Sequence, residues 1–212
     1  MSSGSSDDDD DVPVPQTTNE DDAEDNADDN GESILAAVPN LDSVFGLREI
    51  SKEAICWQLS TAKTGNGVEQ VRESSTETFW QSDGNGQPHW IQLSWSRRTP
   101  VSHVCLFLNY SLDESYTPKK LQIEAGMTPH DFGPAWTVEV SEPVGWVIVP
   151  ITNPPDPLDP YATVVRAHVV RVTVLLMHQN GRDTHVRQLK MYGPGKETKE
   201  SETPRVVMGV IR

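Results

Sequence analysis

The segment His178-Gln179-Asn180-Gly181-Arg182-Asp183-Thr184-His185 is the most informative stretch of the chain. It separates the apolar run 169–177 from a second strand-like run, 186–192. The pair Asn180-Gly181 alone is enough to reverse the chain in a hairpin, because both residues tolerate positive φ. The remaining polar side chains exceed what a turn requires, and their many donors and acceptors indicate recognition of a ligand.

Two further polar segments lie beside strand-like runs. The segment Asp113-Glu114-Ser115-Tyr116-Thr117-Pro118 separates the runs 101–110 and 121–125. The segment Phe79-Trp80-Gln81-Ser82-Asp83-Gly84 leads into the run 89–96. Loops held by a rigid scaffold are the usual carriers of binding residues, so these three polar segments are the candidate functional loops.

Most of the chain after residue 43 shows the two-residue period of β-strands. Residues 91–95 alternate between apolar and polar side chains, and the apolar stretch 164–177 predicts one long strand, straight or bent. A helix is expected only at residues 68–73 and around Glu53. Many strands separated by Gly and Pro predict an all-β antiparallel sandwich, and periodicity alone fits either a jelly roll or an immunoglobulin-like sandwich.

Large aromatic and sulfur-containing side chains are the expected core residues. Cys56 and Cys105 both have apolar neighbours, so we expect two buried, reduced thiols, with a disulfide as the alternative. Burial is also expected for five of the six tryptophans, which are Trp57, Trp80, Trp95, Trp136 and Trp146.

The net charge of −15 is concentrated at the N-terminus. Residues 1–42 contain fourteen Asp or Glu and no Lys or Arg, whereas the remainder contains eighteen acidic and seventeen basic residues. An acidic segment with few apolar residues cannot bury enough surface to offset its chain entropy, so residues 1–42 are predicted to be a disordered tail. Residues 43–193 are then one domain, and residues 194–212 a flexible C-terminal segment.

Nucleic-acid and membrane partners are disfavoured by the sequence. No basic patch marks a nucleic-acid interface, and no run reaches the eighteen apolar residues that a membrane span requires. The N-terminal residues also lack the basic and apolar regions of a secretory signal.

Catalytic chemistry has little support in the sequence. His178, Asp183 and His185 could be imagined as metal ligands, but a structural zinc site usually contains thiolates, and a catalytic site requires three convergent ligands. Each cysteine lies in a core-like run rather than in the electropositive setting of a reactive thiolate. We therefore predict no metal site, no cofactor and no enzymatic activity.

The motifs HQNGRDTH at 178–185, DESYTP at 113–118 and WQSDG at 80–84 resemble the Doc domain of the anaphase-promoting complex, a ubiquitin ligase. The resemblance covers about residues 45–193 and returns at the C-terminal pair Ile211-Arg212. It implies a jelly-roll sandwich of the galactose-binding-domain type. It also implies a non-catalytic ligase subunit of the cell cycle, located in the nucleus and cytoplasm.

The same resemblance implies that the three loops bind destruction-box degrons together with a propeller-shaped coactivator, and so raise the processivity of ubiquitination. The acidic loop residues could pair with a basic residue of the degron, while Asn180 could bond its backbone. Taken alone, Arg182 and Asp183 would fit a simple loop ion pair. The predicted degron-binding residues are Gln81, Ser82, Asp83, Glu114, Ser115, Tyr116, His178, Asn180, Gly181, Arg182, Asp183 and His185.

The C-terminal pair Ile211-Arg212 follows a polar linker and a short apolar segment. From the residues alone it could be a final strand or a frayed end. The resemblance implies that it docks into the groove of a tetratricopeptide-repeat scaffold subunit. Ile211 would then fill an apolar pocket, Arg212 would pair with acidic residues, and basic or amide donors would bind the terminal carboxylate.

Two other functions remain open at this stage. A free-standing jelly roll could bind glycans or lipid head groups, because sandwich folds host many functions. Exposed aromatic rings at the loop tips would favour that alternative, and only Tyr116 and Trp80 are candidates. A scaffold domain without a ligand site is the third possibility.

Overall fold

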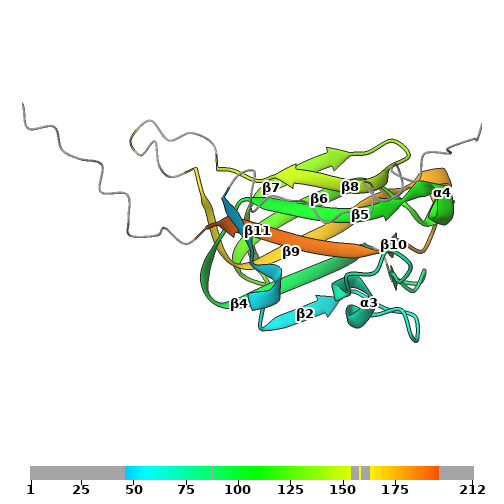
Figure 1. Cartoon of the computed structure of the whole chain (residues 1–212), viewed down its shortest axis with the longest axis horizontal. Helices are drawn as coiled ribbons and strands as arrows, with labels where there is room; N and C mark the ends of the chain where they lie inside the picture. The colour runs from blue at the N-terminus through cyan, green and yellow to red at the C-terminus, as the bar shows by residue number, and fades with distance from the viewer. Residues whose placement is uncertain (1–45, 87, 154–157, 159–162, 196–212) are drawn as a thin grey trace, which may run out of the picture.

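The described residues of the computed structural model are 46–86, 88–153, 158 and 163–195 (Figure 1). Their strands form two facing antiparallel sheets, so the predicted all-β sandwich is confirmed. The predicted acidic tail over residues 1–42 and the pair Ile211-Arg212 lie outside the described residues.

The larger sheet has five strands. In spatial order they are β2 (Cys56–Leu59), β4 (His89–Val101), β9 (Val165–Met177), β6 (Pro118–Thr128) and β7 (Asp131–Glu139). The apolar stretch 164–177 is thus one long central strand, as predicted. A bulge between Ser94 and Thr99 shifts the register of β4 against β9, which allows two long strands to bend together.

The smaller sheet has four strands, and a short ribbon lies beside the sandwich. The four strands are β1 (Leu47–Glu49), β11 (Gln188–Pro194), β5 (His103–Asn109) and β8 (Val144–Pro150). The ribbon pairs β3 (Trp80–Gln81) with β10 (His185–Val186). This ribbon joins two of the candidate loops directly.

Helical structure in the described residues is confined to short segments. They are α3 (Val68–Arg72), α4 (Tyr110–Asp113), η1 (Ser51–Glu53), η2 (Glu114–Tyr116) and η3 (His178–Asn180). The helix predicted at 68–73 and the turn near Glu53 are confirmed. The sequence did not indicate α4, where the Asn109 side chain caps the helix by accepting a hydrogen bond from the backbone N–H of Leu112.

The core lies between the two sheets, and each strand contributes alternate residues to it. Leu93 of β4 and Ile123 of β6 face Leu106 of β5 and Leu189 of β11, and all four side chains are buried. Burying one such side chain stabilises the fold by about 1.5–3 kcal/mol. The sandwich is therefore a rigid support for the loops at its ends.

Two expectations about buried side chains need correction. Trp80 and Trp95 are in the core as predicted, but Trp57, Trp136 and Trp146 are only half-buried. They lie on the edge strands β2, β7 and β8. An edge strand has a neighbouring strand on one side only, so its side chains are less completely covered.

The two cysteines differ from the expected buried pair. Both are free thiols; Cys105 is buried, and Cys56 is exposed. Burial raises the pKa of the Cys105 thiol to about 12, so it is not a reactive thiolate. In the edge strand β2 the alternate residues Trp57 and Leu59 pack against the core, which turns Cys56 to solvent.

The loop after β9 is a crossover between sheets rather than a hairpin. β9 belongs to the five-stranded sheet, whereas β11 pairs with β5 and β1 in the four-stranded sheet. Positive φ occurs at Gln179 and Asn180, while Gly181 has a φ of −55°. The polar residues that exceed the needs of a turn therefore span the end of the sandwich.

Candidate functional site

The three candidate loops meet at one end of the sandwich, near α4 and β10 on the right of Figure 1. Thr184 joins them. Its backbone N–H donates to the Ser82 hydroxyl over 2.8 Å, and its own hydroxyl donates to the Tyr116 carbonyl over 3.3 Å. Both Thr184 and Ser82 are fully buried, so these bonds form an internal connection under the loop surface.

A buried ion cluster supports this end of the molecule. Arg187 forms a bidentate pair with Asp113, with its Nε donating to Oδ2 over 2.8 Å and its Nη2 donating to Oδ1 over 2.9 Å. Nη1 of Arg187 also donates to the carbonyl of Thr76 over 2.5 Å. His185 Nδ1 lies 3.0 Å from the Asp113 carboxylate. One carboxylate thus holds together β10, the residue that links β10 to β11, and the end of α4.

Burial by itself would raise the pKa of Asp113. The hydrogen bonds from His185 and Arg187, together with their charges, outweigh that effect and hold the Asp113 pKa below its ordinary value of 3.8. The carboxylate is therefore ionised at neutral pH and balances the buried guanidinium.

His185 lies between two aromatic rings. Its ring stacks on Phe79 at 4.1 Å and on Tyr116 at 4.4 Å, the latter with an interplanar angle of 8°. Its Nε2 is buried and has no hydrogen-bond partner within the described part of the chain. The stack fixes the Tyr116 ring, which remains 39% exposed at the surface.

His178 has a structural environment. Its Nδ1 donates to the Thr117 carbonyl over 3.0 Å, and its Nε2 accepts from the backbone N–H of Glu142 over 3.2 Å. Both ring nitrogens are therefore occupied in a buried side chain. Of the predicted site residues, Ser82, His178 and His185 lie beneath the surface, where they position the loops.

Asp183 is the centre of the polar surface. Its carboxylate forms an ion pair with Lys63 and accepts a hydrogen bond from Gln81 over 3.3 Å. The hydrogen bond to Asp183 is the main cause of the raised pKa of Lys63. The ion pair considered from sequence, between Arg182 and Asp183, is replaced by this contact with Lys63, a residue that sequence reasoning missed.

The remaining predicted residues lie on the same surface. The Asp83 carboxylate accepts a hydrogen bond from the Asn85 side chain over 3.0 Å. Glu114 is exposed and has a positive φ of 44°, which turns the chain sharply between α4 and η2. The half-buried or exposed members of the set are Gln81, Asp83, Glu114, Ser115, Tyr116, Asn180, Gly181, Arg182 and Asp183.

Gly181 allows two loops to approach closely. A Cβ at this position would lie 2.0 Å from the Ser115 carbonyl oxygen, a separation that no side chain tolerates. The glycine is therefore required by contact with the neighbouring loop rather than by a left-handed backbone.

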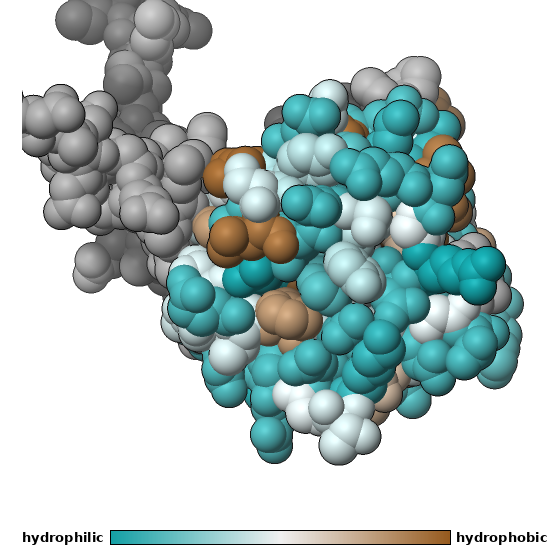
Figure 2. Space-filling view, turned by 90° about the vertical axis from the view of Figure 1, so that its right-hand side faces the viewer, coloured by the Kyte–Doolittle hydropathy of each residue, from teal (hydrophilic) through white to brown (hydrophobic). Residues whose placement is uncertain are grey.

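Figure 2 shows that this end of the molecule is mainly hydrophilic, with scattered apolar side chains. Leu112 of α4 and Leu176 of β9 are exposed on elements that end here. Among the described residues no group of three or more potential metal ligands is found. No helix in the described ranges is long and apolar enough to cross a membrane. The geometry is that of a polar surface on a rigid base.

Comparison with known families assigns the chain. The model of the family "Anaphase-promoting complex, subunit 10 (APC10)" matches residues 18–209. The chain belongs to this family. Subunit 10 of Bos taurus is 42% identical over 165 residues, which cover 78% of this chain and 85% of that protein. Subunit DOC1 of Saccharomyces cerevisiae is 33% identical over 142 residues, which cover 66% of this chain and 54% of that protein. The resemblance inferred from the three motifs is confirmed.

Solved structures show the same fold at low sequence identity. The CBM32-1 and CBM32-2 domains of Clostridium perfringens ZmpB align with a TM-score of 0.57 and 12% identity, over 74% of this chain and 38% of that chain. The same domains in complex with GalNAc align with a TM-score of 0.55 and 13% identity, over 73% of this chain and 37% of that chain. The likeness shows that this member of the subunit 10 family is a jelly-roll sandwich of the galactose-binding type, as expected.

Removing the Asp113 charge should destabilise the domain. In Asp113→Asn the buried Arg187 loses its counter-charge, and we expect the free energy of unfolding to fall by about 3–5 kcal/mol. Urea unfolding at neutral pH measures this. The control Asp131→Asn removes an exposed carboxylate and should change stability by less than about 0.5 kcal/mol. Equal effects in the two variants would contradict the role of the cluster.

The same carboxylate should make stability depend on acid. Because the folded-state pKa of Asp113 is lowered, its contribution is complete above 3.8 and is lost as pH falls below 3.8 through the folded-state pKa. The difference in unfolding free energy between the wild type and Asp113→Asn should therefore shrink as the pH is lowered from 5 to about 2. A constant difference over this range would show that the carboxylate is not stabilised by folding.

A methyl group at Gly181 should separate two of the loops. We expect Gly181→Ala to cost about 1–3 kcal/mol, because its Cβ would overlap the Ser115 carbonyl. Gly133→Ala is the matched control, since the nearest atom to its Cβ would be 3.8 Å away. Thermal unfolding compares the two, and similar melting temperatures would argue against close loop contact.

Proposed function

We propose that this chain is a non-catalytic substrate-recognition subunit of an anaphase-promoting complex ubiquitin ligase and binds destruction-box degrons through the three loops. Membership of the subunit 10 family supports the assembly. The observation that carries the proposed binding role is the convergence of three polar loops on the buried Asp113–Arg187 pair.

The surface is suited to an extended peptide. Asp83, Glu114 and Asp183 provide negative charge, and Asp183 could exchange Lys63 for a basic residue of the degron at small cost, because the pair is partly exposed. Asn180 is exposed and offers both a donor and an acceptor to a peptide backbone. The Tyr116 ring adds a fixed amphipathic contact.

Family membership supports a place in the anaphase-promoting complex, and we propose the individual partners. A propeller-shaped coactivator would hold the other side of the degron, and a tetratricopeptide-repeat scaffold would bind Ile211-Arg212. The subunit would act in the nucleus and cytoplasm. A degron held by two receptors dissociates more slowly than from either one, so more ubiquitins are added in each encounter.

A catalytic role for this chain is not needed and has little support in the described residues. The two histidines of the site, His178 and His185, are buried in structural contacts. The pKa of the buried Cys105 is far above neutral. We infer that ubiquitin transfer is carried out by other subunits.

Binding of glycans or lipid head groups is less well supported. Sugars stack on exposed aromatic faces, but Trp80 is fully buried and the Tyr116 ring is stacked against His185. Structural likeness at 12–13% identity establishes only the fold.

Replacement of the exposed loop residues should reduce substrate capture. In the variant Ser115→Ala, Tyr116→Ala, Asn180→Ala and Asp183→Ala we expect at least about tenfold weaker crosslinking of a destruction-box peptide, equivalent to about 1.4 kcal/mol. The assay contains the assembled ligase, its coactivator and a photoreactive degron. The number of ubiquitins added per encounter should fall in parallel.

A control variant separates recognition from folding. Ile55→Ala, directly before the edge strand β2, and Ile148→Ala, on the edge strand β8, replace exposed side chains and should leave degron crosslinking unchanged. Co-purification with the ligase should be the same for both variants. Undiminished crosslinking in the four-site variant would refute degron binding by these loops, and a new signal on a glycan array or on liposomes would favour the alternative.

Deletion of Ile211 and Arg212 should weaken assembly. Burial of an isoleucine and one charge-assisted hydrogen bond contribute about 1.5–3 kcal/mol each. The loss therefore corresponds to roughly two to four orders of magnitude in affinity. Affinity purification followed by mass spectrometry compares the tagged full chain with the shortened chain. Equal recovery of scaffold subunits would mean that the folded domain, and not Ile211-Arg212, provides the binding energy for docking.

A further inference from the structure

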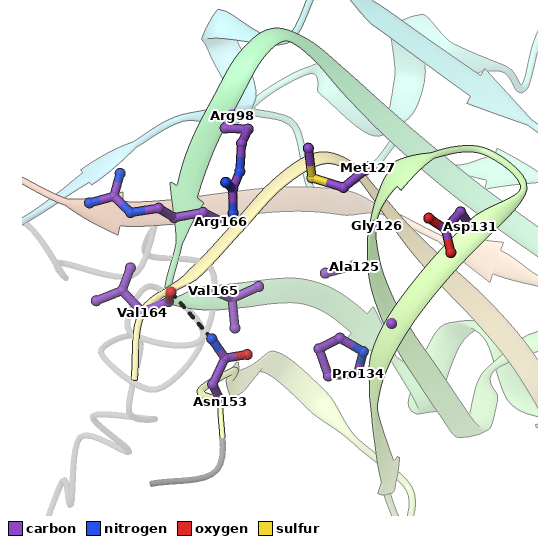
Figure 3. Close-up of a pocket in the computed structure, with 11 residues that line it drawn as sticks. Arg98, Ala125, Gly126, Met127, Asp131, Pro134, Asn153, Val164, Val165 and Arg166 are labelled. Atoms are coloured by element: carbon purple, nitrogen blue, oxygen red, sulfur yellow. Dashed lines mark hydrogen bonds between the residues drawn. The ribbon is translucent and has the colours of Figure 1, made fainter. Parts of the chain in front are cut away.

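A second concave site lies at the end of the sandwich opposite the three loops. β4 and β9 are antiparallel, so the end of β4 and the start of β9 meet there, with Val101 paired to Val165. The cavity has a volume of about 640 Å³, which is in the range of ligand-binding sites. Figure 3 shows it between these strands and the hairpin of β6 and β7.

The cavity has a basic side and an apolar floor. Arg98 of β4 and Arg166 of β9 lie on one side, and Asp131 lies across the cavity on the β6–β7 hairpin (Figure 3). Both arginines are exposed, and neither guanidinium has an ion pair or hydrogen bond within the described residues. The floor includes Ala125 and Val165.

The N-terminal segment has the complementary chemistry, with a run of acidic residues and a short apolar run. Residues 20–32 contain eight acidic side chains and no basic one, and residues 34–38 read Ile-Leu-Ala-Ala-Val. Carboxylates suit the two unpaired arginines, and the apolar residues suit the floor. The domain from residue 43 onward is nearly neutral as a whole, so residues 1–42 carry almost all of the unbalanced negative charge of the chain.

The described chain also begins near this cavity. The Gly46 carbonyl accepts a hydrogen bond from the N–H of Gly195, and Gly193 lies against the Pro100 carbonyl. Pro100 is in turn paired with Arg166. The path from Gly46 to Arg166 therefore crosses about three strand spacings, or about 14 Å. The seven residues from 39 to 45 span up to about 23 Å when extended. Residue 38 can therefore reach the cavity without strain.

We propose that residues 20–38 dock in the cavity of the same molecule, with the acidic residues against Arg98 and Arg166 and the Ile34-Leu35 pair on the floor. Exposed ion pairs are individually weak, but a short tether gives an effective concentration in the millimolar range. This cavity lies at the end opposite the three loops, so docking of the segment does not depend on the proposed function.

Photocrosslinking in the full chain tests this directly. Met127 lines the cavity and is 42% exposed, so p-benzoylphenylalanine placed there would contact a docked segment. We expect intramolecular crosslinks to residues 20–38, identified by mass spectrometry of the monomer. In the Arg98→Glu and Arg166→Glu variant the yield should fall by about fivefold or more, because attraction becomes repulsion. Lys119→Glu, at the other end of β6, is the control and should retain the yield.

A second variant avoids any effect on folding. Replacing Asp21, Asp22, Glu24 and Asp25 by Asn or Gln leaves the sandwich untouched and should lower the yield as the arginine substitutions do. Crosslinks that reach other segments, that join two copies of the chain, or that persist in both charge variants would overturn intramolecular docking of this segment.

Discussion

The bidentate pair between Asp113 and Arg187 is the interaction on which the loop end of the sandwich depends. A buried guanidinium is costly unless a carboxylate and further acceptors surround it, and here the Thr76 carbonyl completes the set. The pair joins the end of α4, the start of β11 and the segment before β3. His185 adds a third contact and carries the Tyr116 ring with it. The buried ion cluster thus positions the loops from beneath, and the hydrogen bonds of Thr184 connect them to one another.

This support divides the polar segments into two layers. Ser82, Thr184 and His178 form hydrogen bonds inside the protein, and their side chains are buried away from solvent. Asn180 is exposed on the backbone that those bonds hold, and the half-buried Asp183 lies beside it in an ion pair with Lys63. A surface arranged in this way loses little conformational entropy on binding, because the ordering has already occurred on folding. Weak polar contacts can then give useful affinity when a second receptor shares the same peptide.

Sequence periodicity predicted the sandwich and the long strand β9, because these depend on the local pattern of apolar residues. The sequence also predicted the short helix α3, which follows the Gly65-Asn66-Gly67 breaker. The three motifs predicted which segments meet, and the family match confirms the resemblance that they carry. Sequence could not show that Asp113 belongs with Arg187, since 74 positions separate the two residues and many other carboxylates were available. It also could not show that Lys63, in a segment without a motif, would pair with Asp183. The edge positions of Trp57 and Cys56 depend on strand order, which alternation does not encode.

The common fold and the particular function have separate physical origins in this molecule. Interleaved aliphatic side chains between two sheets determine the jelly roll, and a carbohydrate-binding domain with 12% identity satisfies the same requirement. Nothing in that core favours one ligand over another. At the loop end of this chain Trp80 is drawn into the core, and its indole N–H donates to the Thr61 carbonyl over 2.8 Å. An aromatic residue that could stack on a sugar is thereby used to anchor a loop, and the exposed surface is left to carboxylates and amides. That exchange favours a polar peptide over a sugar at this end of the sandwich.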